Sequence, residues 1–172
     1  RSTVPAIVDV TTGAVVNNDY HALTTELALG FKDFISPDAP DIYPEELRAD
    51  IDALNVIIYA DFNLAVNLAA LVTNQKDYEY YYDRIFARLD WLEERLSKQR
   101  YLMGDTITDS DIRIFPTLAR FDLVFYQKYL VNKKRLVDYP NLWNYAKDLY
   151  SNPAFGGTTD FDSMRKRFYY VD

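Results

Sequence analysis

Few side chains in this sequence could carry out chemistry directly. It contains a single histidine, His21, and no cysteine, so it offers one candidate general base, no thiol nucleophile and no disulfide. Because metal sites need clustered ligands, one histidine without cysteines predicts no metal site. We expect His21, near the start of a helix, to be a solvated surface residue rather than a base. The basic cluster Arg165, Lys166 and Arg167 could hold an anionic ligand, and a surface role fits it equally well.

The composition limits the class of protein. The 172 residues allow one large or two small domains, and 49% hydrophobic residues allow a sizeable core. A net charge of −7 and a pI of about 4.7 argue against a nucleic-acid-binding surface. No apolar run approaches the ~18 residues of a membrane span, and no signal segment opens the chain. We therefore expect a cytoplasmic protein without nucleic-acid or membrane partners, whose 15 tyrosines and 10 phenylalanines serve mainly helix packing.

Residues 1–30 have the pattern of the second half of a small α/β domain. The pattern predicts a strand over 3–9 with Pro5 near its start, a turn at 11–13, a second strand over 14–16, and a helix from residues 17–19 to about residue 29. An isolated hairpin is marginally stable in water. The sheet therefore needs strands that these residues do not contain. Either the chain is a fragment, or the missing half is supplied in trans.

After residue 30 the sequence becomes helical. The Pro-rich linker SPDAP (36–40) precedes a helix that begins near Pro44, because proline suits the first helical turn. Thr73 and Asn74 interrupt the helical pattern before a second long helix, and Gly104 ends the segment after it. Further helices are predicted over about 108–124, 139–152 and 162–169.

The clearest local signal is the helix start at Thr108. Its hydroxyl, followed three residues later by Asp111, matches a capping box with Asp in place of Glu. Ile107 and Ile112 stand at the positions of a hydrophobic staple. Both devices fix the start of a helix that must be buried, and Pro116 inside it predicts a bend.

This order of elements resembles the layout of glutathione transferases, which join a thioredoxin-like half to an all-helical domain with a capped, buried central helix. Within that group the motifs resemble the xi class, the glutathionyl-hydroquinone reductases. The matching motifs are RYLMGD (100–105), ITDSD (107–111), LARFD (118–122), DYPNL (138–142), DLY (148–150) and FD (161–162) followed by a basic-aromatic run.

The resemblance covers nearly the whole chain and implies a glutathione-transferase-like fold. It divides the chain into the C-terminal half of a thioredoxin-like domain (1–30), a linker (31–43) and an all-α C-terminal domain (44–172). The segment that carries the family's reactive cysteine would lie before Arg1, so the resemblance implies no catalytic residue within this chain. The chain alone is therefore expected to be inactive.

The resemblance also implies a glutathione site near the start of the chain. In the family, a Val–Pro pair with a cis proline opens the third strand, and here that pair is Val4–Pro5. The γ-glutamyl end of glutathione is held by an acid–Ser step at the next helix start. Here the step is Asp19–Tyr20, which keeps the acid and replaces the hydroxyl residue by an aromatic one. Without the resemblance, Pro5 would be an ordinary edge-strand proline and Asp19 a helix cap; capping and glutathione binding are compatible.

The family binds its quinone substrate with three tyrosines in the helical domain, whose hydroxyls donate hydrogen bonds to the substrate oxygens. The matching positions here are Asn67, Phe125 and Phe168, so this chain departs from the family at all three. Tyr126, Tyr169 and Tyr170 lie next to these positions, but one helical step turns a side chain about 100° away, so we do not expect them to compensate. The predicted pocket is therefore more apolar than the family's.

Two kinds of function follow. The first is a glutathione-dependent thiol transferase or reductase acting on glutathionylated (hydro)quinone-type substrates, with glutathione as co-substrate, a small aromatic acceptor, and a homodimeric state as is common in the family. A variant of this first hypothesis is an active enzyme that uses another acceptor or another thiol. The second is a catalytically silent scaffold or ligand-binding module, favoured by the missing cysteine and pocket tyrosines, since fold does not guarantee activity.

Overall fold

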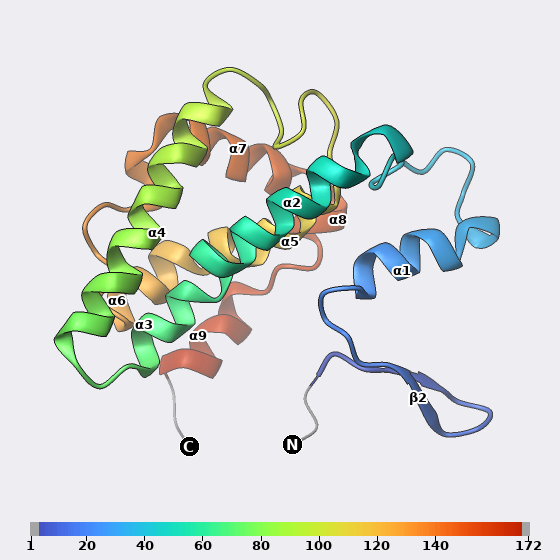
Figure 1. The fold of residues 1–172 in the computed structure, drawn as a ribbon, viewed down its shortest axis with the longest axis horizontal. Helices are drawn as coiled ribbons and strands as arrows, with labels where there is room; N and C mark the ends of the chain where they lie inside the picture. The colour runs from blue at the N-terminus through green and yellow to red at the C-terminus, as the bar shows by residue number, and fades with distance from the viewer. Residues whose placement is uncertain (1–3, 170–172) are drawn as a thin grey trace.

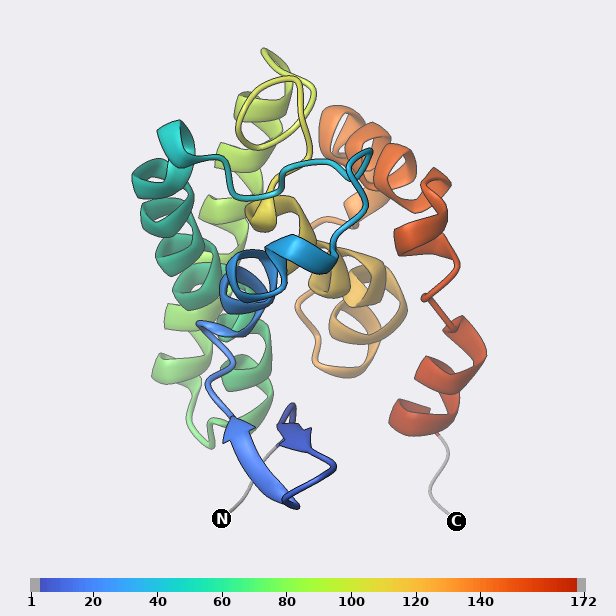
Figure 2. The ribbon, with the colours of Figure 1, turned by 90° about the vertical axis from the view of Figure 1, so that its right-hand side faces the viewer.

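The computed structural model describes residues 4–169 in two connected parts. Figures 1 and 2 show a small N-terminal hairpin that projects from a larger body of helices, with α1 (Leu23–Gly30) between the two. The start of the strand expected from residue 3 lies outside the described residues. The predicted division into two domains and a linker stays a prediction.

The hairpin consists of β1 (Ile7–Asp9) and β2 (Ala14–Asn17), paired antiparallel. Its turn is closed by the Asp9 carboxylate, which accepts the Thr11 amide at 2.8 Å, and by Gly13, whose φ of +69° suits glycine. The first strand is shorter than predicted. Ile7 pairs with Asn17, where β2 ends, so residues 4–6 have no partner strand in the described part of the chain.

Helix α1 begins later than predicted, at Leu23 rather than at residues 17–19. Two polar side chains explain the difference. The Asn17 Oδ1 accepts the Asp19 amide at 2.6 Å, and the Asp19 Oδ1 accepts the His21 amide at 2.9 Å. These bonds hold the chain in a turn before the helix. Asp19 therefore caps the turn that leads into α1.

A single helical run spans Glu45–Leu71 and forms one side of the body. It comprises η2 (Glu45–Leu47), α2 (Arg48–Ile58), a π-helical turn η3 (Tyr59–Asn63) and α3 (Ala65–Leu71). By length and composition alone this run could cross a membrane, so the expectation that no segment has this property was wrong. A core helix passes the same test, and the run buries these residues in the body: Ile51, Leu54, Ile58, Phe62, Ala65, Val66 and Ala69.

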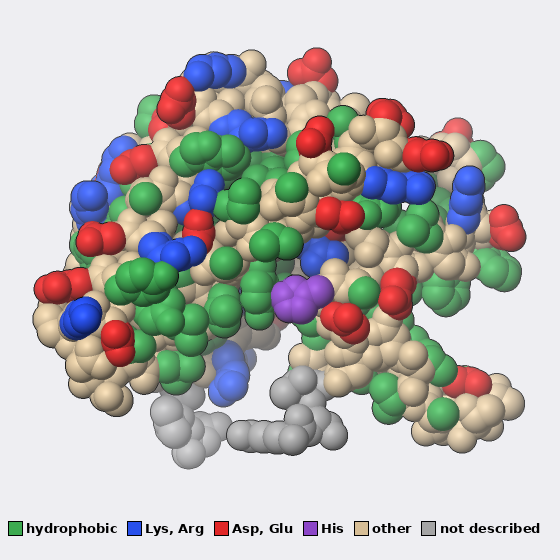
Figure 3. Space-filling model, in the orientation of Figure 1, with side chains coloured by type: hydrophobic (Ala, Val, Ile, Leu, Met, Phe, Trp, Pro, Cys, Tyr) green, Lys and Arg blue, Asp and Glu red, His purple; other side chains and the backbone are tan. Residues whose placement is uncertain are grey.

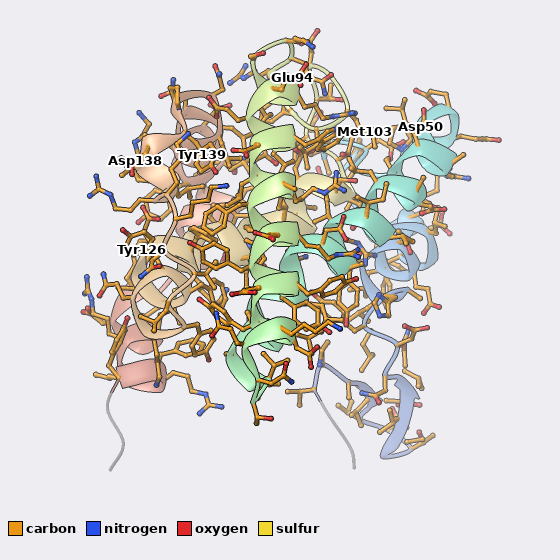
Figure 4. The ribbon with its side chains drawn as sticks, turned by 60° about the vertical axis from the view of Figure 1, so that its left-hand side comes forward. Asp50, Glu94, Met103, Tyr126, Asp138 and Tyr139 are labelled. Atoms are coloured by element: carbon orange, nitrogen blue, oxygen red, sulfur yellow. The ribbon has the colours of Figure 1, made fainter. Side chains whose placement is uncertain are left out.

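Helix α4 (Gln75–Leu96) packs against α3 and α7 (Pro140–Ser151). It begins at the predicted interruption, because the Asn74 side chain accepts the Asp77 amide at 2.9 Å. Tyr139, at the start of α7, lies beside α4 in Figure 4 and donates its hydroxyl to Asp90 at 3.0 Å. Burial and the Asp90 carboxylate raise the pKa of the Tyr139 phenol.

Helix α5 (Asp109–Arg120) confirms the predicted capping box. The Asp111 carboxylate accepts the Thr108 amide at 2.8 Å and the Thr108 hydroxyl at 3.0 Å. It also accepts the Leu102 amide at 3.0 Å and the Tyr145 hydroxyl at 2.6 Å. The start of α5 is therefore fixed from three segments of the chain, with Asp111 fully buried.

The end of α5 differs from the continuous helix that the sequence suggested. Pro116 lies inside α5, and after Arg120 the chain passes through a π-helical turn, η4 (Phe121–Phe125). Proline lacks the amide that would bond to the carbonyl four residues earlier, so its own effect falls upstream of this turn, and nothing in the structure explains the π-helical geometry. The remaining elements are α6 (Tyr126–Lys128), η1 (Lys32–Phe34), η5 (Leu136–Asp138), α8 (Pro153–Gly156), which was not predicted, and α9 (Phe161–Tyr169).

Candidate functional site

The two segments of the predicted glutathione site lie together. The Val4–Pro5 peptide bond is cis, as the resemblance implied. The Asn18 side-chain amide donates to the Pro5 carbonyl oxygen at 2.8 Å. The residue just before the Asp19–Tyr20 step is thus bonded directly to the proline of the cis pair.

The turn at Asp19 presents its side chains towards the helical body. Asp19 itself is exposed. Tyr20 lies 6.2 Å from the ring of Tyr59 on η3, and the His21 ring meets Tyr59 edge-on at 4.4 Å. His21 is exposed, as expected, and in Figure 3 the single histidine (purple) marks the surface where the N-terminal segment meets the body. Aromatic contacts therefore connect this turn to the helices.

A cavity of about 330 Å³ brings the three predicted acceptor residues together with this turn. Its walls come from the Asp19–Tyr20 turn, η3, α3, α5, η4 and α9. The lining residues are Tyr20, Tyr59, Asn63, Leu64, Asn67, Pro116, Thr117, Arg120, Phe125 and Phe168. Val4, Pro5 and Asp19 do not line it. Their roles, like those of the lining residues, stay predictions.

Aromatic rings form part of the cavity wall, at Tyr20, Tyr59, Phe125 and Phe168. Phe125 is 3% exposed, and Tyr129 connects it to Phe168 through ring distances of 5.8 and 6.4 Å. Tyr126 does not line the cavity, and the Tyr169 hydroxyl instead donates to the Leu123 carbonyl at 2.5 Å. Tyr126 and Tyr169 therefore do not replace the hydroxyls missing at the two phenylalanines, and Tyr170 lies outside the described residues.

The polar groups of the cavity wall are mostly engaged with one another. The Thr117 hydroxyl donates to the Asn63 Oδ1 at 2.8 Å, and the Asn63 amide donates to the Arg113 carbonyl at 3.0 Å. Asn67 donates one amide hydrogen to the Asn63 carbonyl at 2.9 Å. Since its amide oxygen is a separate acceptor, Asn67 keeps polar groups for a ligand.

Arg113 connects α5 to the turn that precedes α1 and to α1 itself. The sequence did not predict this role. Its guanidinium forms an ion pair with the buried Asp109, one turn earlier on α5. It also donates to the His21 carbonyl at 2.7 Å and to the Thr24 hydroxyl at 2.6 Å, both in the α1 region. The i,i+4 spacing of Asp109 and Arg113 was the available sequence signal, but the bonds to α1 depend on tertiary structure.

The basic cluster of α9 does not belong to this site. Arg165 pairs with Asp162 at 2.8 Å and lines a separate, apolar cavity of about 520 Å³ with Trp143 and Phe161. Among residues 4–169, no group of three or more His, Cys, Asp or Glu side chains could hold a metal ion.

The comparisons with known proteins define the class. Residues 75–148 match the family model described as glutathione S-transferase, C-terminal domain. A glutathione transferase from Gordonia bronchialis superposes with a TM-score of 0.94 at 45% identity, over 98% of this chain and 53% of that one. The chain has the glutathione transferase fold, with a partial thioredoxin-like N-terminal part and an all-α C-terminal domain, as predicted.

Within that class the chain is similar to the xi proteins. The xi glutathione transferase of Phanerochaete chrysosporium superposes with a TM-score of 0.93 at 36% identity, over 98% of this chain and 55% of that one. The glutathionyl-hydroquinone reductases PcpF of Sphingobium chlorophenolicum and YqjG of Escherichia coli are each 34% identical to it over 98% of its length. The predicted resemblance to the xi class is confirmed. The chain spans about half the length of these curated relatives, 54% and 51%.

Proposed function

We propose that this chain forms part of a glutathione-dependent thiol transferase that acts on glutathionylated, hydroquinone-type substrates. One observation carries the proposal: Tyr20, from the predicted glutathione turn, lines the same cavity as Asn67, Phe125 and Phe168. A thiol bound at the turn would lie beside an aromatic acceptor in the cavity. The similarity to YqjG, solved with glutathione bound, supports this arrangement.

On the glutathione side, the proposal assigns backbone recognition to Val4, which is 90% exposed and therefore open to a ligand. The exposed Asp19 carboxylate would hold the ammonium group, and the amides at the start of the α1 turn would face the carboxylate. Two of these amides, of His21 and Ala22, already bond to Asp19, so fewer remain for a ligand. Tyr20 would cover the thiol.

The chemistry requires a cysteine from outside these 172 residues, since they contain none. Its thiolate would attack the sulfur of the glutathionyl substrate, forming a Cys–glutathione disulfide while the C–S bond breaks and the leaving carbon takes up a proton. The thiolate of a second glutathione would then attack this disulfide, giving oxidised glutathione and restoring the cysteine thiolate. This chain would contribute binding and orientation, and by itself would be inactive.

On the acceptor side, the proposed pocket binds mainly through aromatic contact. Phe125 and Phe168 offer no hydroxyls, and Asn67 supplies a shorter amide in place of a phenol. A hydroquinone would therefore be held by its ring faces more than by its oxygens. This favours weaker orientation of the acceptor than three tyrosine donors would give.

A silent, ligand-binding scaffold is the second candidate, and the same two phenylalanines favour it. The two proposals differ in the need for a thiol. If the scaffold proposal is right, the double variant Phe125→Tyr, Phe168→Tyr should bind hydroquinones without gaining turnover, in this chain and in the natural polypeptide alike; the enzyme proposal expects turnover in the natural polypeptide.

The test begins with the natural polypeptide, because the activity belongs to the whole protein. Its intact mass and N-terminal sequence should reveal a mass well above 20.1 kDa and an upstream cysteine. That polypeptide should reduce a glutathionyl-hydroquinone with glutathione, and a Cys→Ser variant should not. A mass of 20.1 kDa, or full-length protein without turnover, would favour the scaffold. A cytoplasmic location and a homodimer are parts of the proposal that fractionation and light scattering would test.

A further inference from the structure

Arg120 is the charged side chain in the wall of the cavity. It stands at the last position of α5, is half-buried, and lies in the same wall as Tyr20 and Phe125. Its Nη1 donates to the Pro116 carbonyl at 2.6 Å, one turn earlier on the same helix. A guanidinium has five N–H donors, so one such bond leaves most of them available.

Arg120 differs from most other arginines of the helical body, which are paired with aspartates. Across residues 4–169, Arg120 takes part in none of the ion pairs. The paired arginines are Arg84 and Arg88 with Asp61, Arg100 with Asp148, Arg113 with Asp109, Arg135 with Asp138, and Arg165 with Asp162.

The environment of this cation is unfavourable without an anion. Burial lowers the pKa of Arg120, which shows that its charged form has lost solvation. Nevertheless an arginine stays charged near neutral pH. Its free donors are not sealed in the protein: in the described part of the chain, the fully buried polar side-chain atoms without a partner belong to Arg88 and Asp109. The donors of Arg120 are therefore not trapped unpaired inside the protein, and the residue lines the cavity.

The other groups of the wall do not neutralise it. The residues lining the cavity include no aspartate or glutamate. Asn63 and Thr117 bond to each other, as described above. Asn67 and the hydroxyls of Tyr20 and Tyr59 are polar but carry no charge near neutral pH. Arg120 thus provides a full positive charge beside aromatic surfaces, where an anion is attracted more strongly than in bulk water.

We propose that Arg120 makes the cavity selective for aromatic acceptors that carry an anionic group, a carboxylate, sulfonate or phenolate. The ring would lie against Phe125 and Phe168, with the anionic group paired to the guanidinium. This inference rests on the proposed function, because it takes the cavity to be the acceptor site. It adds a substrate class that the loss of tyrosine hydroxyls alone does not specify.

The test compares two probes of similar shape on the 172-residue chain. Isothermal titration calorimetry at pH 7 measures the Kd of 2-naphthoate, an anion, and of 2-naphthol, which is neutral. The variants are Arg120→Met, which removes the charge, Arg120→Lys, which keeps it, and Lys76→Met, which removes a charge from an exposed residue on α4. Circular dichroism confirms folding, and Arg120→Gln replaces the Met variant if that variant does not fold.

Wild-type protein should bind 2-naphthoate more tightly than 2-naphthol. Arg120→Met should weaken 2-naphthoate binding at least about tenfold, the scale of a lost hydrogen bond to a charged group, and change 2-naphthol binding less than about twofold. Lysine should retain part of the preference, and Lys76→Met all of it. Added NaCl should weaken naphthoate binding to the wild type and leave naphthol binding unaffected.

Three results would overturn the inference. If 2-naphthol binds and 2-naphthoate binds no more tightly, the cavity does not select anions. The proposal that the cavity is the acceptor site is then not contradicted. If Arg120→Met weakens both probes equally, the arginine supports packing and does not select. If neither probe binds the wild type, the inference fails, whereas the proposed function is tested separately by the turnover of a glutathionyl-hydroquinone in the natural polypeptide.

Discussion

Arg113→Met should separate the predicted glutathione turn from the helical body. The Arg113 side chain is 11% exposed and its partner Asp109 is fully buried, so solvent does little to replace their ion pair. The same guanidinium holds α1 through His21 and Thr24. Without it, the Asp109 carboxylate keeps the Asn55 amide, at 2.8 Å, as its side-chain donor among the described residues.

The expected cost follows from this burial. Removing one partner of a buried ion pair costs about 3–5 kcal/mol, because the other charge is left uncompensated. Because the Arg113 side chain is slightly exposed, solvent screens the pair in part, and we expect a cost at the lower end of this range. The free energy of unfolding should therefore fall by about 3 kcal/mol. Arg135→Met is the matched control. Its pair with Asp138 is 55% and 41% exposed, and such surface pairs contribute about 0–1 kcal/mol.

Urea unfolding followed by circular dichroism measures both free energies. Hydrogen exchange adds a local measurement: the amides of α1 should lose protection in Arg113→Met and keep it in Arg135→Met. Asp109→Asn separates the two roles of Arg113, since it removes the ion pair but leaves the bonds to α1. Equal stability of Arg113→Met and wild type, with α1 still protected, would refute this reasoning.

Two further predictions concern other buried bonds. Burial raises the pKa of Asp61, but hydrogen bonds from Arg88 and Arg84 more than offset it and hold the pKa below 3.8. This pairing should therefore stabilise the fold fully above about pH 4 and be lost as the pH falls through the lower, folded-state pKa. Acid titration of the free energy of unfolding should show a steeper loss in wild type than in Asp61→Asn; parallel curves would exclude the pairing. Tyr145→Phe removes a hydroxyl that bonds Asp111 at 2.6 Å, and should cost about 1–3 kcal/mol in urea unfolding. A cost below about 0.5 kcal/mol would mean that water replaces the bond.

The start of α5 was predictable because its determinants are local. Thr108 and Asp111 are three residues apart, and they form the capping box, in which the Asp111 carboxylate accepts the Thr108 amide. The start of α1 was placed four to six residues too early. There, Asn17 and Asp19 hold a turn with their side chains, and propensity does not distinguish a helix cap from such a turn.

Only the family resemblance brought the proposed acceptor residues together before the structure was known. Nothing in the spacing of Asn67, Phe125 and Phe168 places them in one cavity, because they lie on separate elements that tertiary packing brings together. Arg113 and Arg120 escaped prediction for the same reason. Each stands on α5, but their functional neighbours, around His21 and Tyr20, lie about a hundred residues earlier in the chain.

The most direct test of the site is a pair of titrations of the isotopically labelled chain by NMR. Glutathione should shift the amides of Val4 and of residues 19–22, and a neutral hydroquinone should shift those around Asn67, Phe125 and Phe168. Both ligands should shift Tyr20, because it belongs to both halves of the proposed site. Shifts confined to the cavity beside Trp143, or two separate sets that do not meet at Tyr20, would contradict it.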